Sequence, residues 1–154
     1  MDKEKDTSHV LQELQNVTSL TESLKVINNN DGNFTDMTFS KYFNQYLASN
    51  QTLKLSNIVN DSGLTRTYGY AVVNGEKKGS RDRIIALCFA AGMTFDETNH
   101  ALKYAGHNEL YARGKRDAVI IAAINTRNNP SSNCKTVTDL SILLDEMGFE
   151  PLDI

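Results

Sequence analysis

The stretch Leu55–Gly75, LSNIVNDSGLTRTYGYAVVNG, decides the fold of this chain. Leu55, Ile58 and Val59 recur at the three- and four-residue spacing of a helix face. Gly63 then permits a left-handed turn, and Thr65 is a residue type that caps the start of a second helix. The pattern therefore predicts two short helices, 54–61 and 65–73, joined by a tight turn.

Helical patterns continue on both sides of this stretch. The apolar residues that begin at Phe39 keep helical spacing through Leu47, and residues 81–91 form a strongly apolar helix. The chain of 154 residues contains only two prolines, and it has long stretches without glycine. We therefore predict an all-α fold, with the two short helices followed by two helical hairpins and preceded by an N-terminal amphipathic helix.

The two hairpins are predicted from an internal repeat. Arg81-Asp82 and Arg116-Asp117 each begin an apolar helix, at an offset of 35 residues. The helices that begin near Thr94 and Thr136 match at an offset of 42 residues, through Gly106 and Gly148. The difference between the offsets indicates a loop insertion at 128–133, where proline and asparagine disfavour helix. Chance similarity between amphipathic helices is the alternative, because such helices share apolar spacing.

The N-terminal segment carries one apolar seam, formed by Val10, Leu14, Val17, Leu20, Leu24 and Ile27. This helix either packs on the body of its own chain or serves self-association. The polar run 28–33 reads as a linker, because asparagine and glycine favour turns. The predicted organisation is an N-terminal helix and linker (1–34), a domain of helices (35–106) and a C-terminal helical hairpin region (107–154).

Charge is distributed unevenly along the chain. The formal net charge is −3, yet residues 54–83 hold six basic against three acidic side chains, and residues 111–127 hold four against one. The net charge therefore argues against a protein that coats nucleic acid by overall charge attraction, whereas the two local basic islands remain. No apolar run approaches the length of a membrane span, and two cysteines are too few for a disulfide framework. These features predict a cytoplasmic protein without a membrane partner.

The residues that usually carry catalysis are not grouped in this sequence. His9, His100 and His107 are scattered, and none has the spacing of a metal ligand. Gly75 and Gly79 lack the length and the following lysine of a phosphate-binding loop. We therefore expect no enzyme activity, no metal and no cofactor.

Two short helices joined by a tight turn are what a helix-turn-helix requires, since its second helix lies in the major groove of DNA. From Leu53 to Gly106, and above all in the step from Gly63 to Gly75, the chain resembles the Cro and lambda-repressor (XRE-type) superfamily of helix-turn-helix regulators. It differs from that family at Gly69, where a branched apolar residue is usual, and at Ala71, which cannot form the hydrogen bonds of glutamine or arginine.

The resemblance implies a set of residues that contact double-stranded DNA. Thr65 would contact the backbone, and the groove would be met by Arg66, Thr67, Tyr70 and Ala71. Among these, Arg66 is the best candidate for reading guanine, and Ala71 would touch a thymine methyl group. The loop that follows would meet phosphates through Lys77, Lys78 and Arg81.

These observations predict a sequence-specific DNA-binding transcriptional regulator. A homodimer would match a two-fold operator, formed through the 10–27 helix or the C-terminal repeat. The alternative is a protein-interaction adaptor that uses a helix-turn-helix fold without DNA readout, with its protein partner at the C-terminal helical region. Gly69, Ala71 and the repeated hairpin motivate this alternative.

Overall fold

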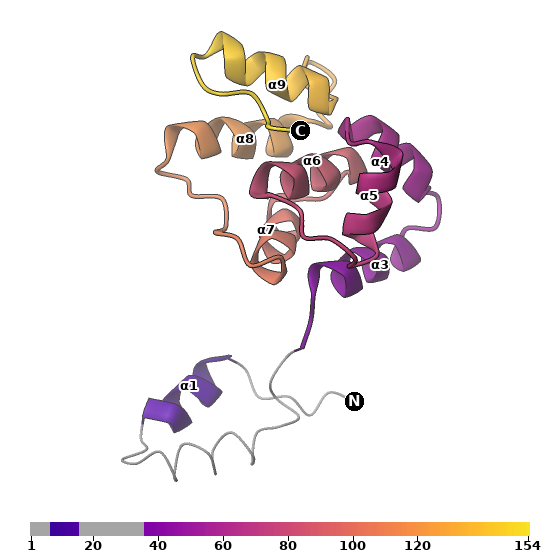
Figure 1. Cartoon of the computed structure of the whole chain (residues 1–154). Coiled ribbons are helices and arrows are strands. Elements are labelled where there is room, and N and C mark those ends of the chain that lie inside the picture. The colour runs from indigo at the N-terminus through magenta and orange to yellow at the C-terminus, as the bar shows by residue number, and fades with distance from the viewer. Residues whose placement is uncertain (1–6, 16–35) are drawn as a thin grey trace. The chain divides into compact units, whose positions relative to one another are not determined.

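The computed structural model describes residues 7–15 and 36–154. Every regular element in these two ranges is a helix, which confirms the predicted all-α class (Figure 1). The chain divides into two compact units, Met1–Asp36 and Met37–Ile154. Helix α1 (Thr7–Gln15) belongs to the first unit, and the rest of the predicted N-terminal seam and the 28–33 linker lie outside the described residues.

The second unit holds seven helices in its described part. They are α3 (Phe39–Ser49), α4 (Leu55–Ser62), α5 (Arg66–Val73), α6 (Arg81–Ala91), α7 (Phe95–Tyr104), α8 (Lys115–Thr126) and α9 (Val137–Glu146). Hydroxyl side chains cap the starts of five of them, namely Thr38, Thr65, Ser80, Thr94 and Thr136. Each such cap contributes roughly 1 kcal/mol, so local sequence sets where these helices begin.

Helix α6 is the centre of the second unit. Its residues from Ile84 to Phe89 are all buried, and the helix packs against α4, α7 and α9. A helix that is apolar on all sides belongs in a core, because no face of it gains from contact with water. Burial also raises the pKa of the Cys88 thiol far above its ordinary value, so this cysteine is an inert core residue.

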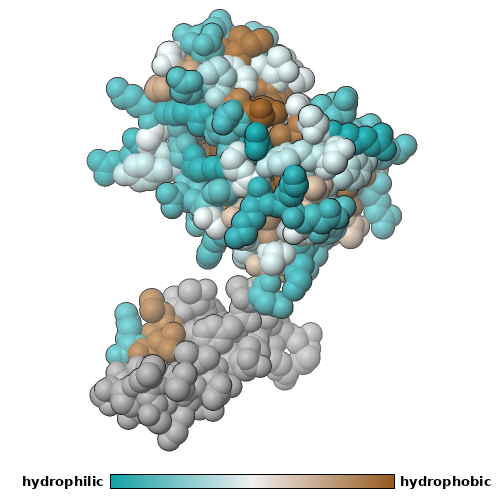
Figure 2. All heavy atoms as spheres, viewed as in Figure 1, coloured by the Kyte–Doolittle hydropathy of each residue, from teal (hydrophilic) through white to brown (hydrophobic). Residues whose placement is uncertain are grey.

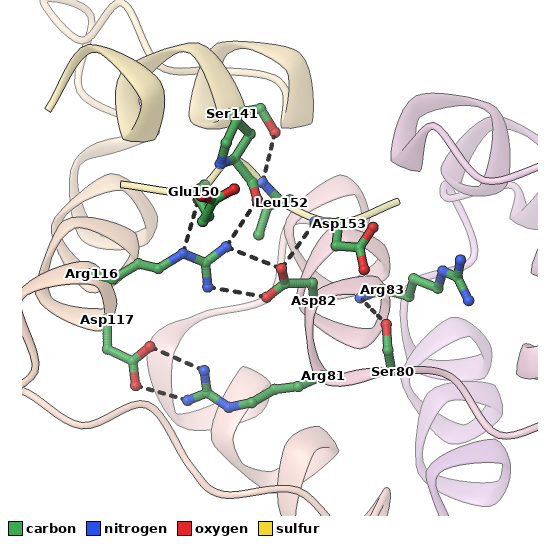
Figure 3. Close-up of polar contacts among 11 residues, drawn as sticks. Ser80, Arg81, Asp82, Arg83, Arg116, Asp117, Ser141, Glu150, Leu152 and Asp153 are labelled. Atoms are coloured by element: carbon green, nitrogen blue, oxygen red, sulfur yellow. Dashed lines mark hydrogen bonds and ion pairs between the residues drawn. The ribbon is translucent and has the colours of Figure 1, made fainter. Parts of the chain in front are cut away.

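The predicted repeat is present as two helical hairpins, α6–α7 and α8–α9, that exchange ion pairs. Arg81 of the first copy binds Asp117 of the second through both carboxylate oxygens, at 3.0 and 2.8 Å. Arg116 of the second copy binds Asp82 of the first in the same way, at 3.2 and 3.0 Å (Figure 3). Equivalent residues thus exchange partners, as they do across a two-fold axis.

The backbone contacts of the two arginines repeat as well. Each guanidinium donates to two carbonyls in the tail that follows the second helix of its own copy. The acceptors are Asn108 and Glu109 for Arg81, and Glu150 and Pro151 for Arg116, at an offset of 42 residues. Both tails leave their helices through a left-handed glycine, with φ 81° at Gly106 and 85° at Gly148. Chance similarity between amphipathic helices does not account for matched contacts of this kind.

The ion pair of Asp117 with Arg81 makes a pH-dependent contribution to the stability of the fold. Burial alone would raise the pKa of the Asp117 carboxyl, but hydrogen bonds from Arg81 and the Tyr111 amide, with the charges of Arg81 and Arg116, lower the pKa below the usual 3.8. A lowered pKa in the folded state means that the ion pair stabilises the fold above pH 4 and is lost as the pH falls through the folded value.

We expect the stability difference between wild type and Asp117→Asn to be largest near pH 7 and to shrink below about pH 4. Urea unfolding of both proteins at several pH values between 7 and 3 measures this difference. A difference that stays constant over the whole range would show that the charge of Asp117 has no part in stability.

Candidate nucleic-acid interface

The turn between α4 and α5 is held by hydrogen bonds on both sides. Gly63 adopts φ 84°, a left-handed conformation that ends α4. The Ser62 hydroxyl donates to the Val59 carbonyl at 2.6 Å and accepts from the Leu64 amide at 3.2 Å. Thr65 then caps α5 by accepting from the Tyr68 amide at 3.3 Å. The direction in which α5 leaves the turn is therefore set by several local bonds.

Gly69 allows α5 to pack closely on α4. A Cβ atom at this position would lie 2.4 Å from Cγ1 of Val59, closer than two carbon atoms can approach. The branched residue that is usual in the resembled family would not fit against this Val59. Glycine at position 69, where the resembled family has a branched residue, therefore matches the close packing of α5 on α4.

One face of α5 remains open to solvent. Arg66 and Thr67 are exposed, and Tyr70 is half-buried with its ring 5.5 Å from the Arg66 guanidinium. Asn74, the C-cap of α5, is also exposed and lies four residues after Tyr70, on the same face. Asn74 was not among the predicted DNA-contact residues, although its spacing from Thr67 and Tyr70 places it on the same helix face.

Two of the predicted DNA-contact residues are placed elsewhere by the structure. Ala71 is only 8% exposed, because it lies on the packed face of α5, so its methyl group is not available to a groove. Arg81 is occupied by Asp117 and by two backbone carbonyls, so it is not free for a phosphate. The candidate surface therefore excludes both residues.

Tyr68 anchors the loop that carries the two predicted phosphate-binding lysines. Its hydroxyl donates to the Lys78 carbonyl at 3.3 Å and accepts from Nη1 of Arg83 at 3.1 Å. The Arg83 guanidinium lies 4.8 Å from the ring centre, and Nζ of Lys77 lies 5.9 Å from it. Lys77 and Lys78 are exposed, so the loop presents both cations beside α5. Arg83 joins this cluster through its contacts with Tyr68.

The first basic island keeps its charge after internal pairing. Arg81 and Asp82 pair with the second hairpin, which leaves five basic side chains in 54–83 against Asp61 and Glu76. In the second island, two of the four cations are taken up by internal contacts, whereas Arg113 and Lys115 are exposed. Arg116 is paired, and Arg127 is buried against Phe89, where it donates to the backbone carbonyl and burial lowers its pKa. Arg66, Lys77 and Lys78 thus remain as exposed cations on α5 and the loop after it.

The fold and this surface define an all-α protein in which a short helix after a tight turn exposes one face beside a basic loop. No family model matches the chain, and no curated protein or solved structure matches it either. Within residues 7–15 and 36–154, no three metal-ligating side chains lie together, and no helix has the length and apolar character to cross a membrane. A functional argument therefore depends on the surface of α5 and its neighbours.

Proposed function

We propose that the chain is a sequence-specific DNA-binding transcriptional regulator in which α4 and α5 act as a helix-turn-helix. The observation that carries the proposal is the open face of α5, where Arg66, Thr67, Tyr70 and Asn74 share one side of a short helix. The major groove of DNA admits such a helix, and its edges carry a distinct donor and acceptor pattern for each base pair.

The side chains on this face suit separate tasks in readout. Arg66 can bind guanine through two hydrogen bonds, and Asn74 can bind adenine in the same way. Thr65, at the start of α5, suits a backbone phosphate, and Thr67 suits either a base edge or the backbone. Lys77 and Lys78 supply charge for neighbouring phosphates, and this term makes binding dependent on salt.

A regulator of this kind would act as a homodimer in the cytoplasm. The contacts that one α5 face can make are few, so a single copy binds weakly. Two copies double these contacts and match an operator with two-fold symmetry, with half-sites about one helical turn apart. An adaptor that binds protein instead of DNA is the alternative outcome of the experiment below.

DNA binding is tested with fragments that the full chain selects from a random duplex library, by fluorescence anisotropy at several salt concentrations. We expect Lys77→Gln/Lys78→Gln to weaken binding about equally for all sequences and to reduce the salt slope by about two. We expect Arg66→Ala to lose roughly 1–3 kcal/mol of binding free energy and to relax the preference at one base position.

Lys103→Gln is the matched control, because Lys103 is an exposed lysine that belongs to α7 and not to α5 or the loop after it. It should change neither the affinity nor the base preference. Wild-type binding that is absent, or that is insensitive both to salt and to Arg66→Ala, would reject DNA readout. In that case, recovery of a defined protein partner by the wild-type chain would favour the adaptor.

A further inference from the structure

Equivalent faces of the two hairpins differ in what covers them. In the first copy, Ile84 and Leu87 of α6 are buried, at 1% and 0% exposure. Ile84 lines one small cavity together with Phe39 of α3 and Val72 of α5, so α3 and α5 cover this face.

In the second copy, Val119 and Ala122 occupy the positions of Ile84 and Leu87, but Ala122 is exposed and Val119 is only partly buried. The second unit holds no further helices that pack there within the described residues.

The uncovered face forms an apolar groove of about 430 Å³ between α8 and α9. It is lined by Lys115, Ala118, Val119, Ala122, Leu143, Met147 and Phe149. Lys115 is the one charged residue among them, and Met147 is 56% exposed although it is large and apolar. Hydrophobic side chains are visible on the part of the second unit that holds α8 and α9 (Figure 2). An apolar groove of this kind marks an interaction surface.

The shape and charge of the groove fit the same surface on a second molecule of this protein. The α8 side of the groove carries the small side chains of Ala118 and Ala122, whereas the other side carries the larger Leu143 of α9 and Met147, the C-cap of α9. A surface that meets itself across a two-fold axis needs both a ridge and a hollow. Both signs of charge are also present, with Lys115 in the groove and the exposed Asp145 and Glu146 on the last turn of α9.

We propose that the α8–α9 groove is the homodimer interface of this protein, with Leu143 and Met147 of each protomer lying over Ala118 and Ala122 of the other protomer. The four helices then form a bundle whose apolar seam is closed on both sides. The biological purpose of this dimer rests on the proposed function, because a two-fold operator requires two copies of α5. The interface itself does not depend on DNA.

Sedimentation velocity of the full chain without DNA, from about 5 to 200 µM, tests the interface. We expect wild type to shift from monomer to dimer within this range. Met147→Lys and Ala122→Lys should each raise the dimer dissociation constant at least about tenfold, because each places a charge in the apolar contact. Ile142→Lys is the matched control, since Ile142 is 53% exposed on α9 but does not line the groove. It should leave the constant within about twofold.

The altered positions are exposed, so circular dichroism should show unchanged helix content in each variant. If one groove variant unfolds, the dissociation constant of the other still tests the interface. A wild type that stays monomeric at 200 µM, or groove variants that dimerise like wild type, would overturn the proposal. Dimerisation that only a deletion of residues 1–36 abolishes would place the interface in the N-terminal segment instead. Loss of DNA binding in a protein that still dimerises would count against the proposed function alone.

Discussion

Gly69→Ala is expected to lower the free energy of unfolding by about 1–3 kcal/mol, which is the usual cost of overpacking a tight contact. Alanine is the better helix former by roughly 1 kcal/mol, so an exposed helical glycine would show the opposite sign. The reason for the loss is that the new Cβ would lie 2.4 Å from Cγ1 of Val59, which forces α5 away from α4. Urea unfolding followed by circular dichroism measures the change.

A double-mutant cycle with Val59→Ala separates this contact from a general effect of the substitution. Val59→Ala alone leaves a cavity and destabilises the fold, since Val59 is only 2% exposed. In the double variant the methyl group of residue 69 occupies part of that space, so the loss should be clearly smaller than the sum of the two single losses. Additive losses, or a Gly69→Ala variant more stable than wild type, would contradict the close packing of α4 and α5.

Arg116→Ala is expected to lower the free energy of unfolding by about 2–3 kcal/mol. The change leaves the Asp82 carboxylate without its guanidinium and removes the donor to the Glu150 and Pro151 carbonyls. Removing one partner from a fully buried pair costs more, but these side chains keep 25% and 18% of their exposure, so solvent screens part of the loss. Thermal or urea unfolding at pH 7 measures it.

Three further variants test whether the two hairpins are equivalent. Arg81→Ala should cost about as much as Arg116→Ala, because Arg81 makes the same set of contacts in the other copy. Arg116→Lys should recover only part of the loss, since lysine keeps the charge but not the planar fork of donors. Asp82→Ala combined with Arg116→Ala should lose less than the sum of the single variants. A large loss at one arginine and none at the other would contradict the pseudo-symmetric arrangement.

The helices were predictable because their signals are local. Residues 81–91 were expected as one helix and form α6 with the same bounds, since Ser80 supplies a cap and Gly92 ends the apolar run. The short pair around Gly63 was predicted to within a residue or two for the same reason. The repeat was also readable, because copies of one hairpin keep their starting residues and their glycines at constant offsets.

The candidate surface was predicted only in part. Arg66 and Thr67 are exposed as expected, but Ala71 is buried on the packed face of α5. A helix of eight residues contains about two turns, so its periodicity is too short to decide which borderline residues face the core. Asn74 was overlooked, since it lies at the very end of the helix, and the contact of Arg83 with Tyr68 could not be read from the sequence.

What the sequence by itself determined is where the helices begin and end, and that the second half of the chain repeats one hairpin. These properties depend on residues within one or two turns of each other, where caps, glycines and apolar spacing act. Only the tertiary structure decided which charges are free, because the carboxylate partners of Arg81 and Arg116 lie more than thirty residues away along the chain. Contacts between residues so far apart in the sequence determine which arginines form internal ion pairs and which remain as surface cations.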